Sequence, residues 1–257
     1  MSTTNLDKLK AAAEAGNIDI LYEVIQIDSS ILEIIDSNQF VETPLHIAAS
    51  RGHLRFAIEV MNLKPSFAWK LNPQGFSPIH LAMQNDQKRM VSRFVDINKD
   101  LVRVQGREGL TPLHFASQIG EVELLAKLLF ACPDSIQDVT VGGETALHIA
   151  VKNKNFEALH LLVCFLRRNI ERGAREFEYN ILNHKDEDDN TILHISALCI
   201  EPQVTSCHIF RSFSYELKKR KLHSSIFKLH LLSYKVKLTE LTTQDLDCAQ
   251  SEFFAFM

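Results

Sequence analysis

A six-residue motif recurs along this chain at a fixed spacing. It reads TPLHIA at Thr43 and returns as SPIHLA at Ser77, TPLHFA at Thr111, TALHIA at Thr145 and TILHIS at Thr191. The first four copies start 34 residues apart, and the fifth follows after 46, which is one repeat plus 12 inserted residues. A constant period of this length is typical of stacked small units that contact only their neighbours. We therefore predict a repeat array rather than one globular core.

Each repeat carries signals for two short helices, as in GREGLTPLHFASQIGEVELLAKLLFACP. Gly109 suits a hairpin turn that needs positive φ, and Thr111 suits the N-cap of a helix that starts at Pro112. Gly120 is placed to end that helix. A second helix then follows, whose apolar face consists of Val122, Leu124, Leu125, Leu128 and Leu129. The sequence predicts a turn, a short helix and a longer antiparallel helix in every unit.

The repeats are not equally regular. The second one is weaker, because Asp86 stands in the column of Gly52 and Gly120, and Lys88 stands in the first apolar column. Polar residues replace the motif's Thr and His near the N-terminus, as expected of a capping unit with one wet face. The predicted organisation is a capping repeat over 1–35, repeats over 36–170, an insertion loop with an incomplete last repeat over 171–199, and a divergent basic tail over 200–257.

The T-P-L-H-x-A motif resembles the ankyrin repeat. The period of 34 also matches the tetratricopeptide repeat, but the Trp, Gly and Tyr columns of that repeat are absent. The resemblance implies an all-α solenoid of helix–turn–helix repeats with β-hairpin-like turns. Stretches such as DLVRVQGREGLTPLHFAS and ETALHIAVKNKNFEALHLLV look like the plant family of the "bian da" and accelerated-cell-death proteins. Members of that family join such repeats to a C-terminal PGG-type membrane domain and act in defence or cell-death signalling.

This likeness covers about residues 5–199 and stops there. The sequence contains no PGG motif and no apolar run of the ~18–20 residues that a spanning helix needs. Residues 216–237 are basic, and KKRK beside IFKLHLL leaves three alternatives open: a nuclear signal, a peripheral membrane contact through Lys218–Lys237, or a tail that is not the gene's real continuation. The last alternative is favoured, because the register is lost inside a repeat.

Five histidines occupy one column of the motif, which raises the question of a metal site. Stacked helices lie about 10 Å apart, far beyond a shared ~2 Å ligand shell, so no metal is expected. The ankyrin resemblance implies instead that each imidazole bridges backbone groups of adjacent turns and satisfies buried polar atoms. The structural histidines are His46, His80, His114, His148 and His194.

No other pattern supports chemistry. The acidic run at 185–189 lacks the Gly and Glu of an EF-hand and is predicted to be a solvated turn. Gly142-Gly143 lacks the Lys-Ser/Thr of a phosphate loop. We find no nucleophile–base pairing, so we expect neither catalysis nor a cofactor. A net charge of −4 gives no bulk attraction to nucleic acid.

What remains is a surface for a protein partner. In ankyrin-like stacks the turn tips and the exposed side of the first helices form a concave face. Trp69, the only tryptophan, occupies the column of Arg103 and Gln137, so we predict an exposed contact residue. The alternative is that Trp69 covers the loop base beside Phe67. The other predicted contacts are Ser50, Arg51, Gln84, Asn85, Gln118, Ile119, Lys152 and Asn153 on the helices, and Glu42, Phe76, Leu110 and Glu144 at the tips.

Two functional hypotheses follow. The first is a non-enzymatic, cytoplasmic scaffold that binds a partner protein, in line with five scattered cysteines and an N-terminus without the layout of a signal peptide. The second is the soluble part of a membrane-anchored ankyrin/PGG signalling protein, which would be membrane-associated.

Overall fold

The computed structural model describes residues 4–170 and 175–198, with no side-chain detail at 167–170, 175–178, 193, 197 and 198. The chain divides into two compact units, residues 1–146 and 147–257. Within the described residues every regular element is a helix, apart from isolated β-bridges, which confirms the all-α expectation.

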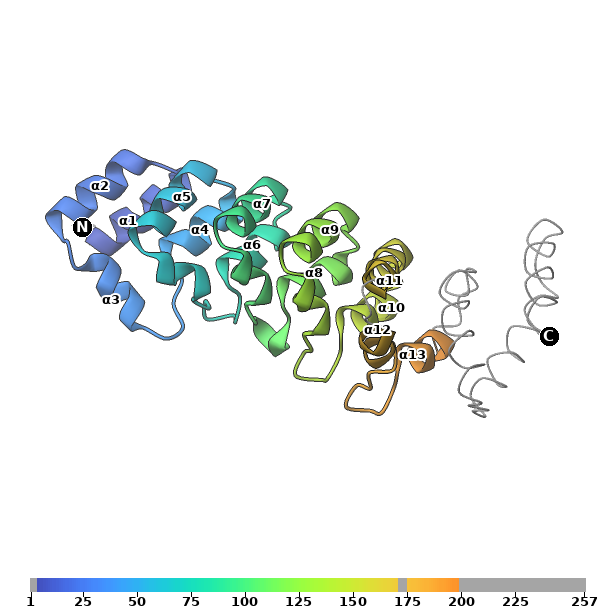
Figure 1. Ribbon diagram of the computed structural model, residues 1–257. Coiled ribbons are helices and arrows are strands. Elements are labelled where there is room, and N and C mark those ends of the chain that lie inside the picture. The colour runs from blue at the N-terminus through green and yellow to red at the C-terminus, as the bar shows by residue number, and fades with distance from the viewer. Residues whose placement is uncertain (1–3, 171–174, 199–257) are drawn as a thin grey trace, which may run out of the picture. The chain divides into compact units, whose positions relative to one another are not determined.

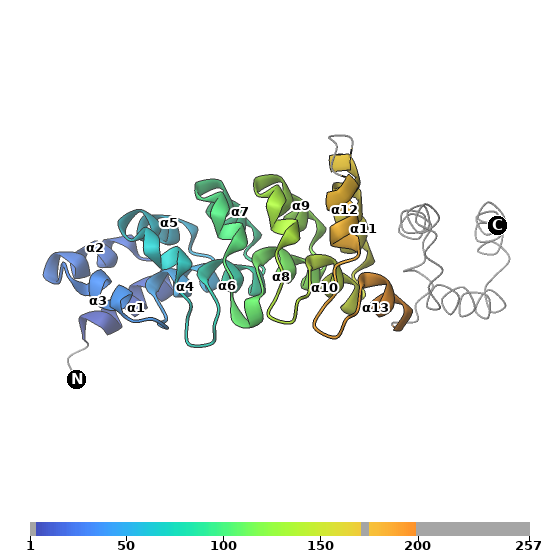
Figure 2. The same ribbon diagram turned by 60° about the horizontal axis from the view of Figure 1, so that its bottom comes forward.

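The first unit consists of stacked helix pairs. The first helices of the repeats contact one another in succession, and each packs against its own second helix (Figures 1 and 2). The first helices are α1 (Asn5–Ala15), α4 (Pro44–Arg51), α6 (Pro78–Gln84) and α8 (Pro112–Ile119). The second helices are α2 (Ile18–Ile27), α5 (Leu54–Leu63), α7 (Lys88–Ile97) and α9 (Val122–Ala131).

Short helices and hairpin-like turns connect one pair to the next. The connecting helices are α3 (Ile31–Ser37) and the 3-10 helices η1 (Pro65–Trp69), η2 (Lys99–Arg103), η3 (Arg107–Gly109) and η4 (Pro133–Gln137). Each turn closes through two backbone bonds; in the first, Asn72 N–H donates to Phe76 O at 2.8 Å and Gly75 N–H to Asn72 O at 2.9 Å. Gly75 has φ +82°, as the turn prediction required.

The first helices begin and end at the predicted residues. Thr43 caps α4, with its hydroxyl accepting from His46 N–H at 3.3 Å, and Pro44 is the first helical residue. The helix ends at Gly52, whose φ is +79°. In the weaker second repeat Asp86 takes the same left-handed conformation at φ +55°, which costs a residue with a Cβ about 1–2 kcal/mol. The repeat thus keeps its geometry at the expense of local backbone strain.

Leucines and other apolar side chains from both helices of each repeat form a continuous core. Leu113 and Ala116 on α8 are fully buried, and so are Leu125, Leu128 and Leu129 on α9. Burying one such leucine contributes about 1.5–3 kcal/mol. Because neighbouring repeats share this core, the stack gains most of its stability from contacts between units.

The second unit holds the inserted residues, and those that the structure describes include a helix. Its helices are α10 (Ala146–Lys152), α11 (Phe156–Ile170), α12 (Arg175–Leu182) and α13 (Ile192–Leu198). Pro65 and Pro133 follow α5 and α9, whereas Arg167 holds that position here and α11 continues for 15 residues. A missing proline permits this extension but does not cause it, because Lys99 holds the same position after α7, which ends at Ile97. Ile181 and Leu182 are buried and account for α12. The expectation of an insertion loop over this part of 171–199 was wrong.

The acidic run forms the predicted turn into the last repeat. Asp189 lies at φ +61°, in the column of the turn glycines, and its N–H donates to Asp186 O at 3.0 Å. The Asp186 carboxylate is buried and accepts from Asn190 N–H at 2.8 Å and from Asp188 N–H at 3.1 Å. The predicted basic tail, 200–257, lies outside the described residues.

Candidate partner-binding surface

Buried histidines of the first unit connect each first helix to the next turn. His46 Nε2 lies 3.1 Å from Lys70 O and 3.0 Å from Phe76 O, and its Nδ1 accepts from Thr43 N–H at 3.1 Å. His80 Nε2 reaches Leu110 O at 3.0 Å, and His114 Nε2 reaches Glu144 O at 3.1 Å. A carbonyl only accepts, so Nε2 carries a proton in each ring. In His46 and His114 the Nδ1 atom accepts from a backbone N–H, so these two rings are neutral.

Burial keeps these imidazoles neutral. Desolvation lowers the pKa of His46 to about 4, against an opposing effect of the hydrogen bonds to Phe76 and Lys70. It lowers the pKa of His80 to about 4 as well, and that of His114 in the same direction. The polar link between helix and turn is therefore intact near neutral pH.

The second unit contains two further histidines of the motif, His148 and His194, and their contacts differ from those in the first unit. His148 is buried, with its ring centroid 6.2 Å from that of His184. His194 is half-buried, and its Nδ1 accepts from Thr191 N–H at 3.2 Å. Among the residues that the structure describes, no group of three or more His, Cys, Asp or Glu side chains could hold a metal ion.

The residues predicted at the turn tips are less accessible than expected. Glu42, Phe76, Leu110 and Glu144 are all half-buried, so the expectation of exposed tips was wrong. The backbone carbonyls of Phe76, Leu110 and Glu144 are each hydrogen-bonded to the histidine of the preceding repeat. The Phe76 ring also lies 6.5 Å from the His80 ring, so its side chain supports the turn.

Most of the predicted helix positions are accessible. Gln84, Asn85, Gln118 and Arg51 are exposed, and Ile119 exposes 43% of its surface. Ser50 is half-buried and donates to Ile47 O at 2.8 Å. In the second unit Lys152 and Asn153 are also exposed, with Lys152 Nζ 3.6 Å from a buried Asp186 oxygen. These residues lie at the C-terminal ends of the first helices.

Trp69 lies elsewhere in the repeat, on the last residue of η1. It exposes 45% of its surface, whereas Phe67 and Ala68 beside it are buried. The polar column-mates Arg103 and Gln137 are exposed too, so this column faces solvent in three repeats. A large aromatic in an exposed column can contribute much of the energy of a protein contact.

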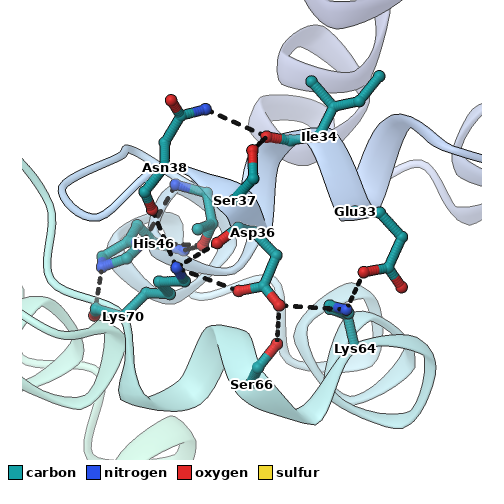
Figure 3. A network of polar contacts seen from close by, with 10 residues as sticks. Glu33, Ile34, Asp36, Ser37, Asn38, His46, Lys64, Ser66 and Lys70 are labelled. Atoms are coloured by element: carbon teal, nitrogen blue, oxygen red, sulfur yellow. Dashed lines mark hydrogen bonds and ion pairs between the residues drawn. The ribbon is translucent and has the colours of Figure 1, made fainter.

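A polar network holds the segment that carries Trp69 against α3 (Figure 3). The Asp36 carboxylate accepts from Ser66 Oγ at 2.8 Å and lies 3.1 Å from Lys64 Nζ and 3.2 Å from Lys70 Nζ. Lys64 Nζ also pairs with Glu33 at 2.6 Å. Lys70 further donates to the carbonyls of Asp36 and Asn38 at the end of α3. Both ends of η1 are thus fixed, and Trp69 is presented on an ordered backbone.

The hydrogen bonds of the network favour the charged forms of Asp36 and Lys64. Burial by itself raises the pKa of Asp36, but hydrogen bonds from Ser66, Lys64 and Lys70 outweigh it and hold that pKa below its usual value. The hydrogen bond to Glu33 raises the pKa of Lys64. The Asp36 carboxylate and the Lys64 ammonium group are therefore both charged at neutral pH. This network has no periodic signal in the sequence, because α3 interrupts the repeat and the partners of Asp36 lie about one repeat away.

Comparison with known proteins places the chain in a family. The family model described as "Ankyrin repeats (3 copies)" matches residues 9–105 and 90–174. The chain belongs to the ankyrin-repeat family. A role in protein interaction follows from that membership, and ankyrin-repeat proteins are typically not enzymes.

One relative agrees with the plant resemblance. The chain is 47% identical over 70 residues to the Arabidopsis thaliana "Ankyrin repeat-containing protein BDA1". The match covers 27% of this chain and 16% of the relative's length. Within the described part of this ankyrin-repeat chain, the helices are all too short or too polar to cross a membrane.

Proposed function

We propose that this protein is an ankyrin scaffold that binds a partner protein through Trp69 on η1, with the exposed ends of the first helices as a second contact region at the other end of the repeat. The observation that carries the proposal is the combination of an exposed indole with an anchored backbone. Trp69 is the only tryptophan of the chain, and its neighbours on η1 are buried or fixed by the Asp36 network.

The physical advantage of this arrangement is entropic. A contact residue on a mobile segment loses conformational freedom on binding, which costs about 0.5–1.5 kcal/mol for each immobilised side chain. The backbone of η1 is already ordered by contacts from Lys64, Ser66 and Lys70. Binding energy from the indole is therefore not spent on ordering the segment.

The finer part of the proposal is signalling in plant defence or cell death. It is supported by the likeness to the Arabidopsis protein BDA1 over 70 residues and by the family phrases around the third and fourth repeats. The whole activity of that relative is not transferred, since the match spans 16% of its length. Membrane association through a PGG-type domain stays the alternative within the same proposal.

The test compares partner capture by wild-type protein and by two variants in extracts of the source tissue. Trp69→Ala removes the exposed indole, and Ile27→Ala removes a comparably exposed apolar side chain from the end of α2. We expect Trp69→Ala to lose a captured protein that wild type and Ile27→Ala both retain. Circular dichroism checks that both variants are folded. Equal recovery by all three proteins would remove Trp69 from the binding surface.

Phe76 serves as a second, informative position. Its half-buried ring supports the turn beside His80, so Phe76→Ala should lower thermal stability as well as binding. Trp69→Ala should lower binding alone. If Phe76→Ala lowers both stability and binding while Trp69→Ala lowers binding alone, Trp69 contacts the partner and Phe76 supports the turn.

A further inference from the structure

We infer that the turn between the two helices in the repeats that start at Thr43 and Ser77, the first and second copies of the motif, is a docking surface for an acidic segment of a partner protein. The surface, called here the arginine patch, consists of Arg51, Arg55, Arg89 and Arg93. It rests on the proposed scaffold function and assigns a chemistry to the partner. All four side chains are exposed, and within the described residues none makes an ion pair or a hydrogen bond.

Repeat geometry brings the four arginines together. Arg51 ends α4 and Arg55 begins α5, so they lie on either side of one turn. Arg89 occupies the position of Arg55 one repeat later, and stacked helices lie about 10 Å apart. Arg93 follows Arg89 by one helical turn on α7. The two turns touch, because a Cβ added to Gly52 would overlap the Gln87 amide.

The surrounding acids do not neutralise the patch. Glu59 accepts from the Tyr22 hydroxyl, and Asp96 pairs with Lys127 at 2.8 Å. Glu121 pairs with Lys88 at 2.6 Å, and the same lysine lies 3.9 Å from Asp86. Asp96, Glu121 and Asp86 are thus paired with lysines and Glu59 with a neutral hydroxyl, whereas the four arginines make no ion pair within the described residues.

Repulsion among these four positive charges does not stabilise the folded protein. Like charges one helical turn apart, as at Arg89 and Arg93, destabilise a helix slightly. Two arginines in the same column of adjacent repeats also repel each other. The guanidinium group suits paired recognition of carboxylates, because its donors form a planar fork. The second residue of each second helix is Asp19 in α2, Arg55 in α5, Arg89 in α7 and Glu123 in α9. The basic stretch is therefore confined to two repeats.

These limits favour an acidic peptide over nucleic acid or a membrane. The net charge of the chain is −4, and a long polyanion would extend beyond the patch onto the acidic ends of the column. A short carboxylate-bearing segment can contact both arginine columns without reaching Asp19 or Glu123. The partner chemistry is therefore an exposed stretch rich in Glu or Asp.

The test measures binding of a fluorescein-labelled peptide of alternating Glu and Ser to the full chain by fluorescence anisotropy. The double variant Arg55→Gln/Arg89→Gln should weaken binding at least about tenfold, since it removes one guanidinium from each repeat. The matched control Lys99→Gln/Arg107→Gln removes two exposed positive charges at the other end of the repeat and should change affinity less than about twofold. A peptide with Gln in place of Glu should not bind.

Three outcomes would overturn the inference. They are no binding of the Glu peptide by wild type, an equal loss in the control variant, or tighter binding of single-stranded DNA or of phosphatidylserine vesicles in the same buffer. Trp69→Ala should keep its affinity for the peptide. A failure of the arginine patch is therefore distinguishable from a failure of the Trp69 surface.

Discussion

The stability of the repeat array should fall steeply between pH 7 and pH 5. His46 and His80 titrate near 6.5 in an unfolded chain, and burial lowers their pKa to about 4 in the folded protein. Above pH 6.5 both states are neutral and the histidines contribute their full stabilisation. As pH falls, the unfolded chain takes up protons that the folded protein refuses, so stability is lost until the pH reaches about 4.

The magnitude follows from the pKa difference. At pH 5 each of the two histidines favours the unfolded chain by about 2 kcal/mol relative to neutral pH, and the pair by about 4 kcal/mol. His114, whose pKa is lowered in the same direction, adds to this loss. Against a typical total of about 5–15 kcal/mol, the change is large. The carboxylates of Asp36 and Asp186 also have lowered pKa values, but their stabilisation is lost only as pH falls below about 4.

The assay is urea unfolding followed by circular dichroism at several values between pH 7 and pH 5. His46→Gln should reduce the slope of unfolding free energy against pH by up to about 1.4 kcal/mol per pH unit, even though it also lowers stability at pH 7. Gln84→Ala, at an exposed position without a titratable group, serves as the control and should leave the slope unchanged. A flat profile in wild type, or an unchanged slope in His46→Gln, would refute the claim that these imidazoles are held neutral.

Three further substitutions test the backbone and the polar network. Gly52→Ala should destabilise the array by at least about 1–2 kcal/mol in urea unfolding, since φ is +79° and a Cβ would meet Gln87. Asp86→Gly should instead stabilise it by about 0.5–1 kcal/mol in the same assay, by relieving φ +55°. Asp36→Asn should speed amide hydrogen exchange in η1, because it weakens the contacts from Lys64 and Lys70; unchanged exchange would mean that η1 is ordered without the network.

Local signals allowed much of the fold to be predicted from the sequence. A helix begins where Thr and Pro satisfy or avoid free N–H groups, and it ends where Gly supplies a left-handed residue, so α4 and α8 could be bounded from the sequence. The two-helix unit followed from the leucine columns. Asp86 shows that the stack imposes the left-handed conformation even where the sequence does not favour it.

The errors concern contacts between repeats. The turn tips were expected to be exposed, but a histidine 30 residues earlier holds Phe76 and Leu110 in place. The insertion was expected to be a loop, because its length breaks the period, yet α12 buries Ile181 and Leu182. The Asp36 network and the arginine patch differ in whether their charged side chains form ion pairs. Sequence spacing alone does not determine that pairing.

The most direct test of the account is isothermal titration of a partner, identified by capture, into wild type, Trp69→Ala and Ile27→Ala. If Trp69 is the main contact, its removal should weaken affinity by about thirtyfold, which corresponds to about 2 kcal/mol for a hot-spot residue. Ile27→Ala should stay within about twofold of wild type. A Trp69→Ala variant that binds as tightly as wild type would contradict the claim that the anchored η1 segment forms the binding surface.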